Sequence, residues 1–307
     1  MRKLIALALV ICLIPSQPLE AQYYYYNSKY YESDVVFEIG VSGGVMNSLT
    51  DLGGKKGIGK NFIKDLRWKT ARLSYGAYIM AMYRNAIGGR IEGTFGQVAG
   101  YDSILKNVAA STNGRYERNL SFRSKIAELQ VAIEIHPLFF RSYDNEKEPP
   151  RFSPYAVIGA GYYSFDPEAY LAGQWFALAP LRLEGQGMAE YPDRKPYHLK
   201  QYNLLGGLGL KYEITPSLNA RLELVHRKLF TDYLDDASTD YIDASLFPNY
   251  LPPIQAAIAQ QLYFRRNEIN ASDIQPLPGD QRGDPRDKDA YFTIQAKIGL
   301  TFGRRRR

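Results

Sequence analysis

The side chains best suited to nucleophilic, acid–base or metal chemistry are few in this 307-residue chain, which has three histidines and one cysteine. A hydrolase needs a nucleophile, a base and an orienting group in one place. His136, His198 and His226 fall at or near the ends of different predicted strands, and no His-Glu-x-x-His zinc motif occurs. The sequence therefore predicts a protein that is not an enzyme and that binds no cofactor.

Charged side chains of both signs instead recur at alternate positions of otherwise apolar segments. Strand geometry sends alternate residues to opposite faces, so these charges share the face opposite the apolar one. A narrow barrel would enclose them, and buried charges persist only when they are paired. We expect an ion-paired plug in the lumen, formed by Glu38, Arg84, Arg90, Glu92, Glu128, Glu134, Arg221, Glu223, Arg227 and Lys297. The alternative is that several of them lie at the rim and are solvated.

The segments that carry these charges have the period of a β-strand. The clearest is 291–302, with apolar residues at every even position. One apolar face and one polar face are typical of outer-membrane barrel strands, which cross the hydrocarbon layer in about 10 residues. The fold class predicted is all-β, an eight-stranded antiparallel transmembrane β-barrel with long extracellular loops. Its strands are expected at 35–46, 72–84, 89–98, 125–136, 152–164, 199–214, 218–227 and 291–302.

The connectors between these segments alternate in length. Long connectors at 47–71, 99–122, 165–198 and 231–290 alternate with shorter ones at 85–88 and 137–151 and with the Thr215-Pro216 turn. Outer-membrane barrels have short periplasmic turns and long external loops, so we expect both termini in the periplasm. A soluble β-sandwich is the alternative fold, but it would have turns every 8 to 12 residues and no such alternation.

The start of the chain reads as an export signal. Arg2 and Lys3 precede an apolar stretch at 4–14, and Ala21 suits signal peptidase. Cys12 lies inside this segment, so the mature chain would have no thiol. Cleavage lowers the net charge from +6 to +5, of which Arg304 to Arg307 supply four, so no nucleic-acid partner is expected. The predicted organisation is a signal peptide at 1–21, a Tyr-rich segment at 22–33, an outer-membrane barrel at 34–303 and a basic tail at 304–307.

Aromatic residues near the expected strand ends predict two interfacial girdles. Their members are Tyr83, Tyr101, Phe139, Phe140, Tyr162, Tyr163, Tyr212, Phe230, Tyr291 and Phe302.

In the last long connector, Pro252 and Pro253 precede a segment at 254–263 that reads as a short helix. Its apolar face, formed by Ile254, Ala257, Ile258 and Leu262, is expected to cover the barrel mouth or to meet a surface partner.

Four aspartates follow the seventh strand, namely Asp232, Asp235, Asp236 and Asp240. Clustered carboxylates can bind Ca²⁺, but the spacing does not fit an EF-hand loop. Bonding from aspartate side chains to free backbone N–H groups is the commoner use of such residues in turns. We therefore favour structural capping over a metal site.

The same connector carries a sharper pattern. Residues 227–241 read Arg-Lys-Leu-Phe-Thr-Asp-Tyr-Leu-Asp-Asp-Ala-Ser-Thr-Asp-Tyr. This segment resembles the R-x-x-F-T-D-Y-L-D-D-V-S-x-x-Y segment of a family of Bacteroidota outer-membrane β-barrels that includes the PorG-like component of the type IX secretion system. Ala237 stands where that pattern usually has Val, and elsewhere the resemblance is one of architecture. The loop residues that carry it are Thr231, Asp232, Tyr233, Leu234, Asp235 and Asp236.

The resemblance implies a non-enzymatic scaffold that ties a periplasmic ring, made of a lipoprotein and its partner, to the outer membrane. In that role the periplasmic turns and the tail at 304–307 would face the ring, although the tail suits anionic lipid headgroups equally well. The expected partners are then outer-membrane lipid and the ring proteins. The alternative functions are a small outer-membrane channel and a surface-binding barrel.

Overall fold

Eight antiparallel strands close into a barrel in the computed structural model, which describes residues 33–52, 69–111, 114–140, 150–272 and 275–304. Each strand pairs with its neighbours along the ring, and the pairing of β3 with β4 closes it. The strands are β1 (Val35–Leu49), β2 (Arg72–Tyr83), β3 (Ile87–Tyr101), β4 (Ser121–Ile135), β5 (Phe152–Ser164), β8 (Lys200–Thr215), β9 (Leu218–Leu229) and β10 (Ala290–Phe302). The predicted eight-stranded fold is confirmed.

The outer surface of the barrel is apolar. Side chains alternate strictly between exposed and buried along most of each strand, as the period of two requires. The outward residues include Val131, Ile158 and Leu208, each more than 60% exposed. A belt of this kind on all eight strands would be unstable in water, and it suits the hydrocarbon of a bilayer. Within the described residues, no helix is both long and apolar enough to cross a membrane.

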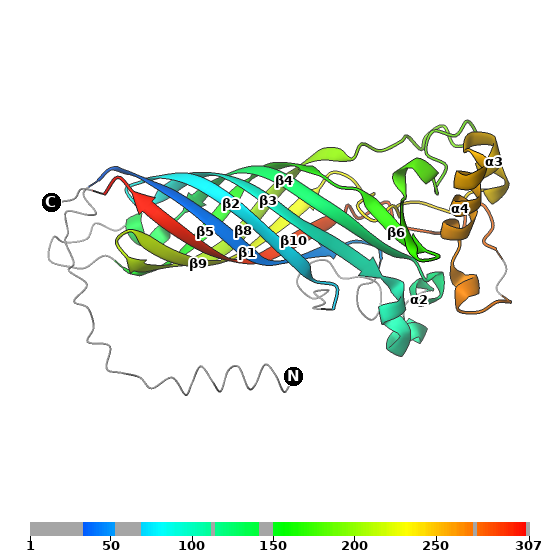
Figure 1. Cartoon of the computed structure of the whole chain (residues 1–307), viewed down its shortest axis with the longest axis horizontal. Coiled ribbons are helices and arrows are strands. Elements are labelled where there is room, and N and C mark those ends of the chain that lie inside the picture. The colour runs from blue at the N-terminus through cyan, green and yellow to red at the C-terminus, as the bar shows by residue number, and fades with distance from the viewer. Residues whose placement is uncertain (1–32, 53–68, 112–113, 141–149, 273–274, 305–307) are drawn as a thin grey trace.

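The two ends of the barrel differ (Figure 1). At one end, here called the turn end, lie the short connectors, together with Ser33 and Arg304, the first and last described residues. The opposite end, the loop end, carries the long connectors with all the described α-helices. The tight turn after β2 is formed by Arg84 and Asn85, both in the left-handed region (φ 50° and 56°), a conformation that asparagine tolerates well.

The long connectors contain ordered elements of their own. They comprise η3 (Asp102–Ser111), α2 (Arg115–Arg118), β6 (Pro167–Leu171), β7 (Gln174–Ala177), η5 (Ala179–Leu181), η6 (Ala244–Leu246), α3 (Phe247–Tyr250), α4 (Pro253–Tyr263) and η7 (Arg266–Glu268). The hairpin of β6 and β7 prolongs the wall of the barrel, since β6 pairs with β4. At the turn end the only described helix is η4 (Pro137–Phe140).

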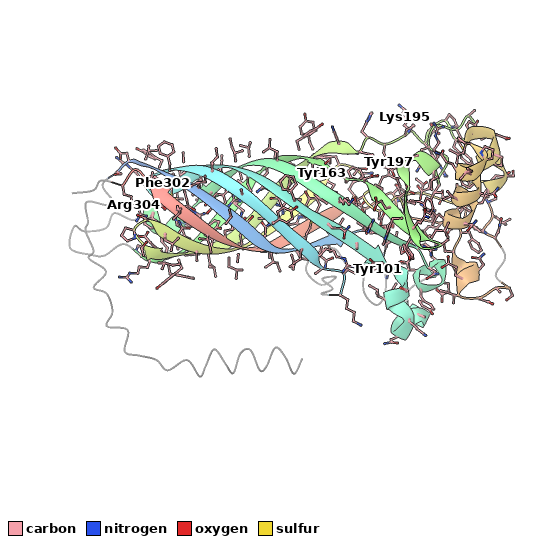
Figure 2. The ribbon with its side chains drawn as sticks, viewed as in Figure 1. Tyr101, Tyr163, Lys195, Tyr197, Phe302 and Arg304 are labelled. Carbon is pink, nitrogen blue, oxygen red and sulfur yellow. The ribbon has the colours of Figure 1, made fainter. Side chains whose placement is uncertain are left out.

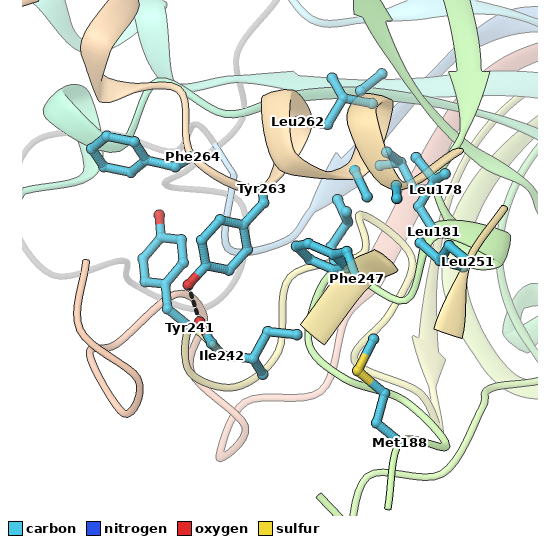
Figure 3. Close-up of a cluster of buried hydrophobic side chains, with 14 residues drawn as sticks. Leu178, Leu181, Met188, Tyr241, Ile242, Phe247, Leu251, Leu262, Tyr263 and Phe264 are labelled. Atoms are coloured by element: carbon cyan, nitrogen blue, oxygen red, sulfur yellow. Dashed lines mark hydrogen bonds between the residues drawn. The ribbon is translucent and has the colours of Figure 1, made fainter. Parts of the chain in front are cut away.

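Two connectors pack together into a cap beyond the loop end. Its core is a buried apolar cluster from the β5–β8 and β9–β10 connectors (Figure 3). Met188 comes from the first connector and Phe247 from the second, while the Tyr263 hydroxyl donates to the carbonyl of Ile242. We call this unit, residues 165–199 and 230–289, the cap.

The predicted helix is present as α4, and its predicted packing face is correct for two of the four residues. Leu262 is buried in the cap and Ile258 packs against its core, as predicted, whereas Ile254 is 77% exposed and Ala257 is also exposed. Ala256 and Ala259 are buried instead. The inward face of α4 therefore combines two alanines with the larger Leu262 and Tyr263.

Candidate functional site

Charged side chains fill the lumen of the barrel. Inward positions of six strands supply five carboxylates and five cations, and all ten are buried. The carboxylates are Glu38, Glu92, Glu128, Glu134 and Glu223, and the cations are Arg90, Lys211, Arg221, Arg227 and Lys297. The charges balance, as burial in a low-dielectric interior demands.

Arg90 lies at the centre of this network. Its Nη1 contacts Glu134 at 2.6 Å and Glu223 at 2.7 Å, and its Nε lies 3.2 Å from Glu92. Lys297 then joins two of the same carboxylates, at 2.6 Å from Glu92 and 2.8 Å from Glu223. Arg90 thus contacts three carboxylates and Lys297 contacts two of them. These ion pairs cross-link β3, β4, β9 and β10 through the interior.

Two further arginines extend the network along the lumen. Arg221 contacts both Glu38 and Glu134 at 2.7 Å, toward the turn end. Arg227 contacts Glu128 at 2.7 Å, toward the loop end. Gln130 links this last pair to the others, since it accepts from Arg227 at 3.1 Å and donates to Glu92 at 2.8 Å. The connected network therefore runs through most of the length of the barrel.

The structure brings together nine of the ten residues predicted for the plug, and Arg84 is the exception. Its side chain is 66% exposed in the turn after β2, where Nε pairs with Asp34 at 3.0 Å. The prediction for Arg84 is wrong because β2 ends at Tyr83 and the left-handed turn conformation breaks the alternation of faces.

Lys211 is a member that the sequence reading missed, although its position matches the inward parity of β8. Its Nζ lies 3.1 Å from Glu38. Two tyrosines also belong to the network: the Tyr78 hydroxyl donates to Glu38 at 2.6 Å and the Tyr155 hydroxyl donates to Glu223 at 2.9 Å. Both rings need space that glycine provides, since a Cβ on Gly40 would collide with Tyr78 and one on Gly209 would collide with Tyr155.

The turn end is closed by a second ion pair. Arg304 donates to both oxygens of Glu213, at 2.7 and 2.9 Å, and both side chains are buried. The hollow that remains beside them has a volume of about 10 Å³, which is room for about one water molecule. The first residue of the predicted basic tail is therefore held inside the barrel end, and Arg305 to Arg307 lie outside the described residues.

At the loop end the charges give way to an apolar layer. Twelve buried side chains from strands and connectors close the lumen there, including Met46, Phe122 and Leu229. Tyr163 and Tyr291, predicted for the interfacial girdle, are fully buried in this layer, so that prediction is wrong for both. Figure 2 shows Tyr163 toward the loop end and Phe302 far from it at the turn end. Other predicted girdle residues are exposed on the outer surface, namely Tyr83, Phe140, Tyr162, Tyr212, Phe230 and Phe302.

The motif loop 231–236 follows β9 directly and lies over this apolar layer. Asp235 accepts from the backbone N–H of Ala237 at 3.0 Å and of Leu52 at 3.1 Å. The backbone N–H of Leu234 donates to Asp289 at 2.8 Å. These aspartates therefore bind backbone groups and fasten the first long connector to the last.

The remaining motif residues also make local contacts. Asp232 accepts from the Ser238 hydroxyl, and the Thr231 hydroxyl accepts from the backbone N–H of Tyr233. Burial raises the pKa of Asp232 to about 8 and that of Asp236 to about 7. In the described part of the chain, no group of three or more His, Cys, Asp or Glu side chains is arranged to hold a metal ion.

A buried ion pair joins the two halves of the cap. The Glu184 carboxylate accepts from Arg282 at 2.7 Å and from the backbone N–H groups of Ser238 and Thr239 at 2.9 and 3.0 Å. Arg282 also donates to the carbonyl of Asp236. Glu184 is fully buried and belongs to the β5–β8 connector, so this carboxylate holds that connector to the β9–β10 connector. Tyr197 of the same connector contacts the motif loop directly, since its hydroxyl donates to Asp236 at 2.7 Å. The sequence reading assigned no role to Glu184 or Arg282, since nothing local marks the pair.

One sequence pattern resembles a catalytic motif without its context. Gly40 to Gly44 read Gly-Val-Ser-Gly-Gly, a Gly-x-Ser-x-Gly spacing that the sequence reading overlooked. In hydrolases that spacing forms a sharp turn between a strand and a helix. Here it lies within β1, and the Ser42 hydroxyl donates to Glu92 at 3.3 Å, with no histidine in the contact. Ser42 is therefore a wall residue of the lumen.

Of the three histidines, His136 alone reaches the interior. It is fully buried at the turn end, with Nε2 3.2 Å from Glu134 and Nδ1 3.1 Å from the Ser153 hydroxyl. His226 is half-buried on the outward parity of β9. The histidines therefore do not converge on one locus.

An apolar exterior around a charge-paired interior defines a transmembrane β-barrel of the outer-membrane type. No protein-family model and no curated protein matches the sequence.

Solved outer-membrane proteins resemble the chain over most of its length. The attachment invasion locus protein Ail of Yersinia pestis, solved with the heparin analogue sucrose octasulfate, is 11% identical, with 88% of this chain and 99% of that chain covered and a TM-score of 0.34. OprG from Pseudomonas aeruginosa is 9% identical over 88% and 96%, with a TM-score of 0.36. A major outer membrane protein from Thermus thermophilus is 11% identical over 87% and 99%, with a TM-score of 0.39. At this level of similarity, no ligand or role of these proteins transfers to this chain.

Proposed function

We propose that this protein is a closed, non-enzymatic anchor in the outer membrane that serves as a PorG-like scaffold of the type IX secretion system. The observation that carries the proposal is the blocked lumen. Ion pairs fill its middle, an apolar layer closes the loop end, and Arg304 with Glu213 closes the turn end. A barrel blocked along its length has its two end surfaces left to meet partners.

The segment 227–241 supports the finer assignment. It resembles the pattern of the barrel family that includes the PorG-like component, and in this protein Asp235 fastens the loops that close the barrel. The same pattern would therefore maintain a closed outer face in a protein whose partners lie on the other side of the membrane.

The proposed topology follows from the unequal connectors. Short periplasmic turns and long external loops are the rule in outer-membrane barrels, so the turn end would face the periplasm. The mature chain would begin after Ala21, within residues that lie outside the described ones. Exposed side chains at the turn end, including Asp34, Arg84 and Phe140, would then be available to the ring lipoprotein and its partner.

Site-specific crosslinking in native envelopes tests the role. A photoreactive residue at Arg84, on the turn end, is expected to capture a periplasmic ring lipoprotein. The matched position is Lys195, which is exposed on the cap and is expected to give no such adduct (Figure 2). Capture of the lipoprotein from Lys195 alone would reverse the proposed topology, and capture from neither position would contradict the secretion role.

Conductance separates this role from that of a small channel. The purified protein in a planar bilayer is expected to show no ion-conducting steps, because the lumen is ion-paired and the hollow beside Glu213 and Arg304 has room for about one water molecule. Stable conductance of the wild-type protein would favour the channel and contradict the closed anchor.

A further inference from the structure

A groove on the outside of the barrel lies just below the loop end. It has a volume of about 810 Å³. It crosses five neighbouring strands near their loop ends, from β2 through β3, β4 and β5 to β8. None of its lining belongs to the lumen network, so the blocked interior gives it no role. The groove therefore lies at the margin of the apolar belt nearest the loop end, where the hydrocarbon of a bilayer meets the headgroups.

The floor of the groove is apolar. Tyr75 on β2 pairs with Phe95 on β3, and Phe95 pairs with Ala127 on β4, so the three side chains form one row around the barrel. The rings of Tyr75 and Phe95 are stacked, with centroids 5.9 Å apart. Leu73 stands beside the row and is 81% exposed. This apolar surface is suited to contact with an acyl chain.

The rim of the groove toward the loop end is cationic. Arg72, Lys125 and Lys200 line it, against a single carboxylate in the lining, Asp166. Among the described residues no carboxylate lies within ion-pair distance of either ammonium group, although the charge of Lys125 acts on the nearby Asp166. Arg72 donates to the Tyr101 hydroxyl at 3.0 Å, which leaves other N–H groups of its guanidinium able to donate.

The register fixes the spacing of the two lysines. Ser164 on β5 pairs with Ala127 on β4 and with Lys200 on β8. Lys125 lies two residues above Ala127 on the same face of β4. The two ammonium groups are therefore carried two strands apart, about 10 Å across the sheet. Cations at this spacing above an apolar floor complement a lipid whose headgroup carries separated negative charges.

We infer that the groove is a binding site for an anionic, phosphate-bearing lipid of the leaflet at the loop end. Lys125, Lys200 and Arg72 would contact the phosphates, and Leu73, Tyr75 and Phe95 would hold the acyl chains. Charge complementarity selects this occupant, because three cations and one carboxylate give the lining a net positive charge that a neutral lipid would not compensate. The inference does not depend on the proposed secretion role.

The test uses the full mature protein in nanodiscs of phosphatidylcholine containing lipid A, a glycolipid with two phosphates on one disaccharide. Retained lipid A is counted by native mass spectrometry after the nanodisc is released. Replacing both lysines in K125Q/K200Q is expected to weaken retention about 25-fold, at about 5-fold for each basic residue near the surface. Phe95→Ala is expected to weaken the retention of lipid A as well, because it removes a ring from the apolar floor.

Lys228→Gln is the matched control. Lys228 is an exposed lysine on the outer face of β9 toward the loop end, and it does not line the groove. It is expected to retain lipid A as the wild type does. Circular dichroism and heat-modifiable migration verify that each variant is folded.

Three outcomes would overturn the inference. They are unchanged retention by folded K125Q/K200Q, an equal loss in Lys228→Gln, and displacement of lipid A by millimolar inorganic phosphate. The second outcome would mean that any basic residue of the belt suffices, and the third that the apolar floor contributes nothing.

Discussion

Arg221 on β9 donates to the Glu38 carboxylate on β1 at 2.7 Å, although the two residues are 183 positions apart in the chain. The same guanidinium contacts Glu134 on β4, so one side chain joins three strands through the interior of the barrel. Such a contact exists only when the sheet has closed. The ion pairs therefore stabilise closure itself, because an open sheet would expose each partner without its counterion.

Arg221→Ala is expected to lower the free energy of unfolding by about 3–5 kcal/mol, because it leaves Glu38 and Glu134 buried without a main partner. Urea unfolding of the protein in lipid vesicles, followed by fluorescence, measures the change. The control is Arg84→Ala, whose guanidinium is mostly exposed at the turn end, and it is expected to unfold as the wild type does. Equal destabilisation by the two variants would contradict the role of the network.

Gly209→Ala tests the space that the lumen leaves for its tyrosines. A Cβ at this inward position of β8 would collide with the Tyr155 ring, and overpacking of this kind costs about 1–3 kcal/mol. Gly206 is the matched glycine on the same strand, since a Cβ there meets nothing within 4 Å. Gly206→Ala is expected to preserve stability in the same urea assay. A loss of stability as large as that of Gly209→Ala would contradict the steric explanation.

Arg282→Ala is expected to loosen the cap, because Glu184 would lose its cation while remaining buried beneath the motif loop. Limited proteolysis of intact cells or vesicles should then cut within 165–199 and 230–289 at least about tenfold faster, while the strands stay protected. Arg286→Ala provides the comparison, since that side chain is 89% exposed four residues later. If both variants are cut at the wild-type rate, the Glu184–Arg282 pair does not hold the cap.

The motif loop predicts a pH dependence of the cap. Burial, the largest effect on each, raises the pKa of Asp232 to about 8, of Asp51 to about 7 and of Asp235 to about 6, compared with about 3.9 in an unfolded chain. Carboxyl groups with a raised pKa bind protons more tightly in the folded state, so the stability they contribute is present below about pH 4. It is lost progressively as the pH rises to about 8.

Protease susceptibility of the cap should therefore increase between pH 5 and pH 8.5, after correction for the activity of the protease at each pH. Asp232→Asn keeps an oxygen for the Ser238 hydroxyl and removes the titration with the highest pKa of the three, so the increase in susceptibility should become smaller, while the contributions of Asp51 and Asp235 remain. Asp243→Asn is an exposed control at the surface of the cap and should leave the profile unchanged. A profile that rises toward low pH would refute the assignment.

Much of the architecture was readable from the sequence because a strand has a period of two. Alternation placed Glu92 and Lys297 on inward faces before either strand had a partner, and the unequal connectors separated the turn end from the loop end. The helix α4 was equally readable from Pro253 at its start. These features depend on residues close together in the chain, for which local geometry is sufficient.

The tertiary structure alone decided which charges meet and which faces pack. Arg84 left the network because a left-handed turn interrupts the alternation, and Lys211 joined it because closure brought β8 to face β1 across the lumen. The Glu184–Arg282 pair and the groove beside Lys125 likewise join connectors or strands that are distant in the chain. Pairing across 98 residues, as between Glu184 and Arg282, depends on how the whole chain folds back on itself, and no local pattern encodes it.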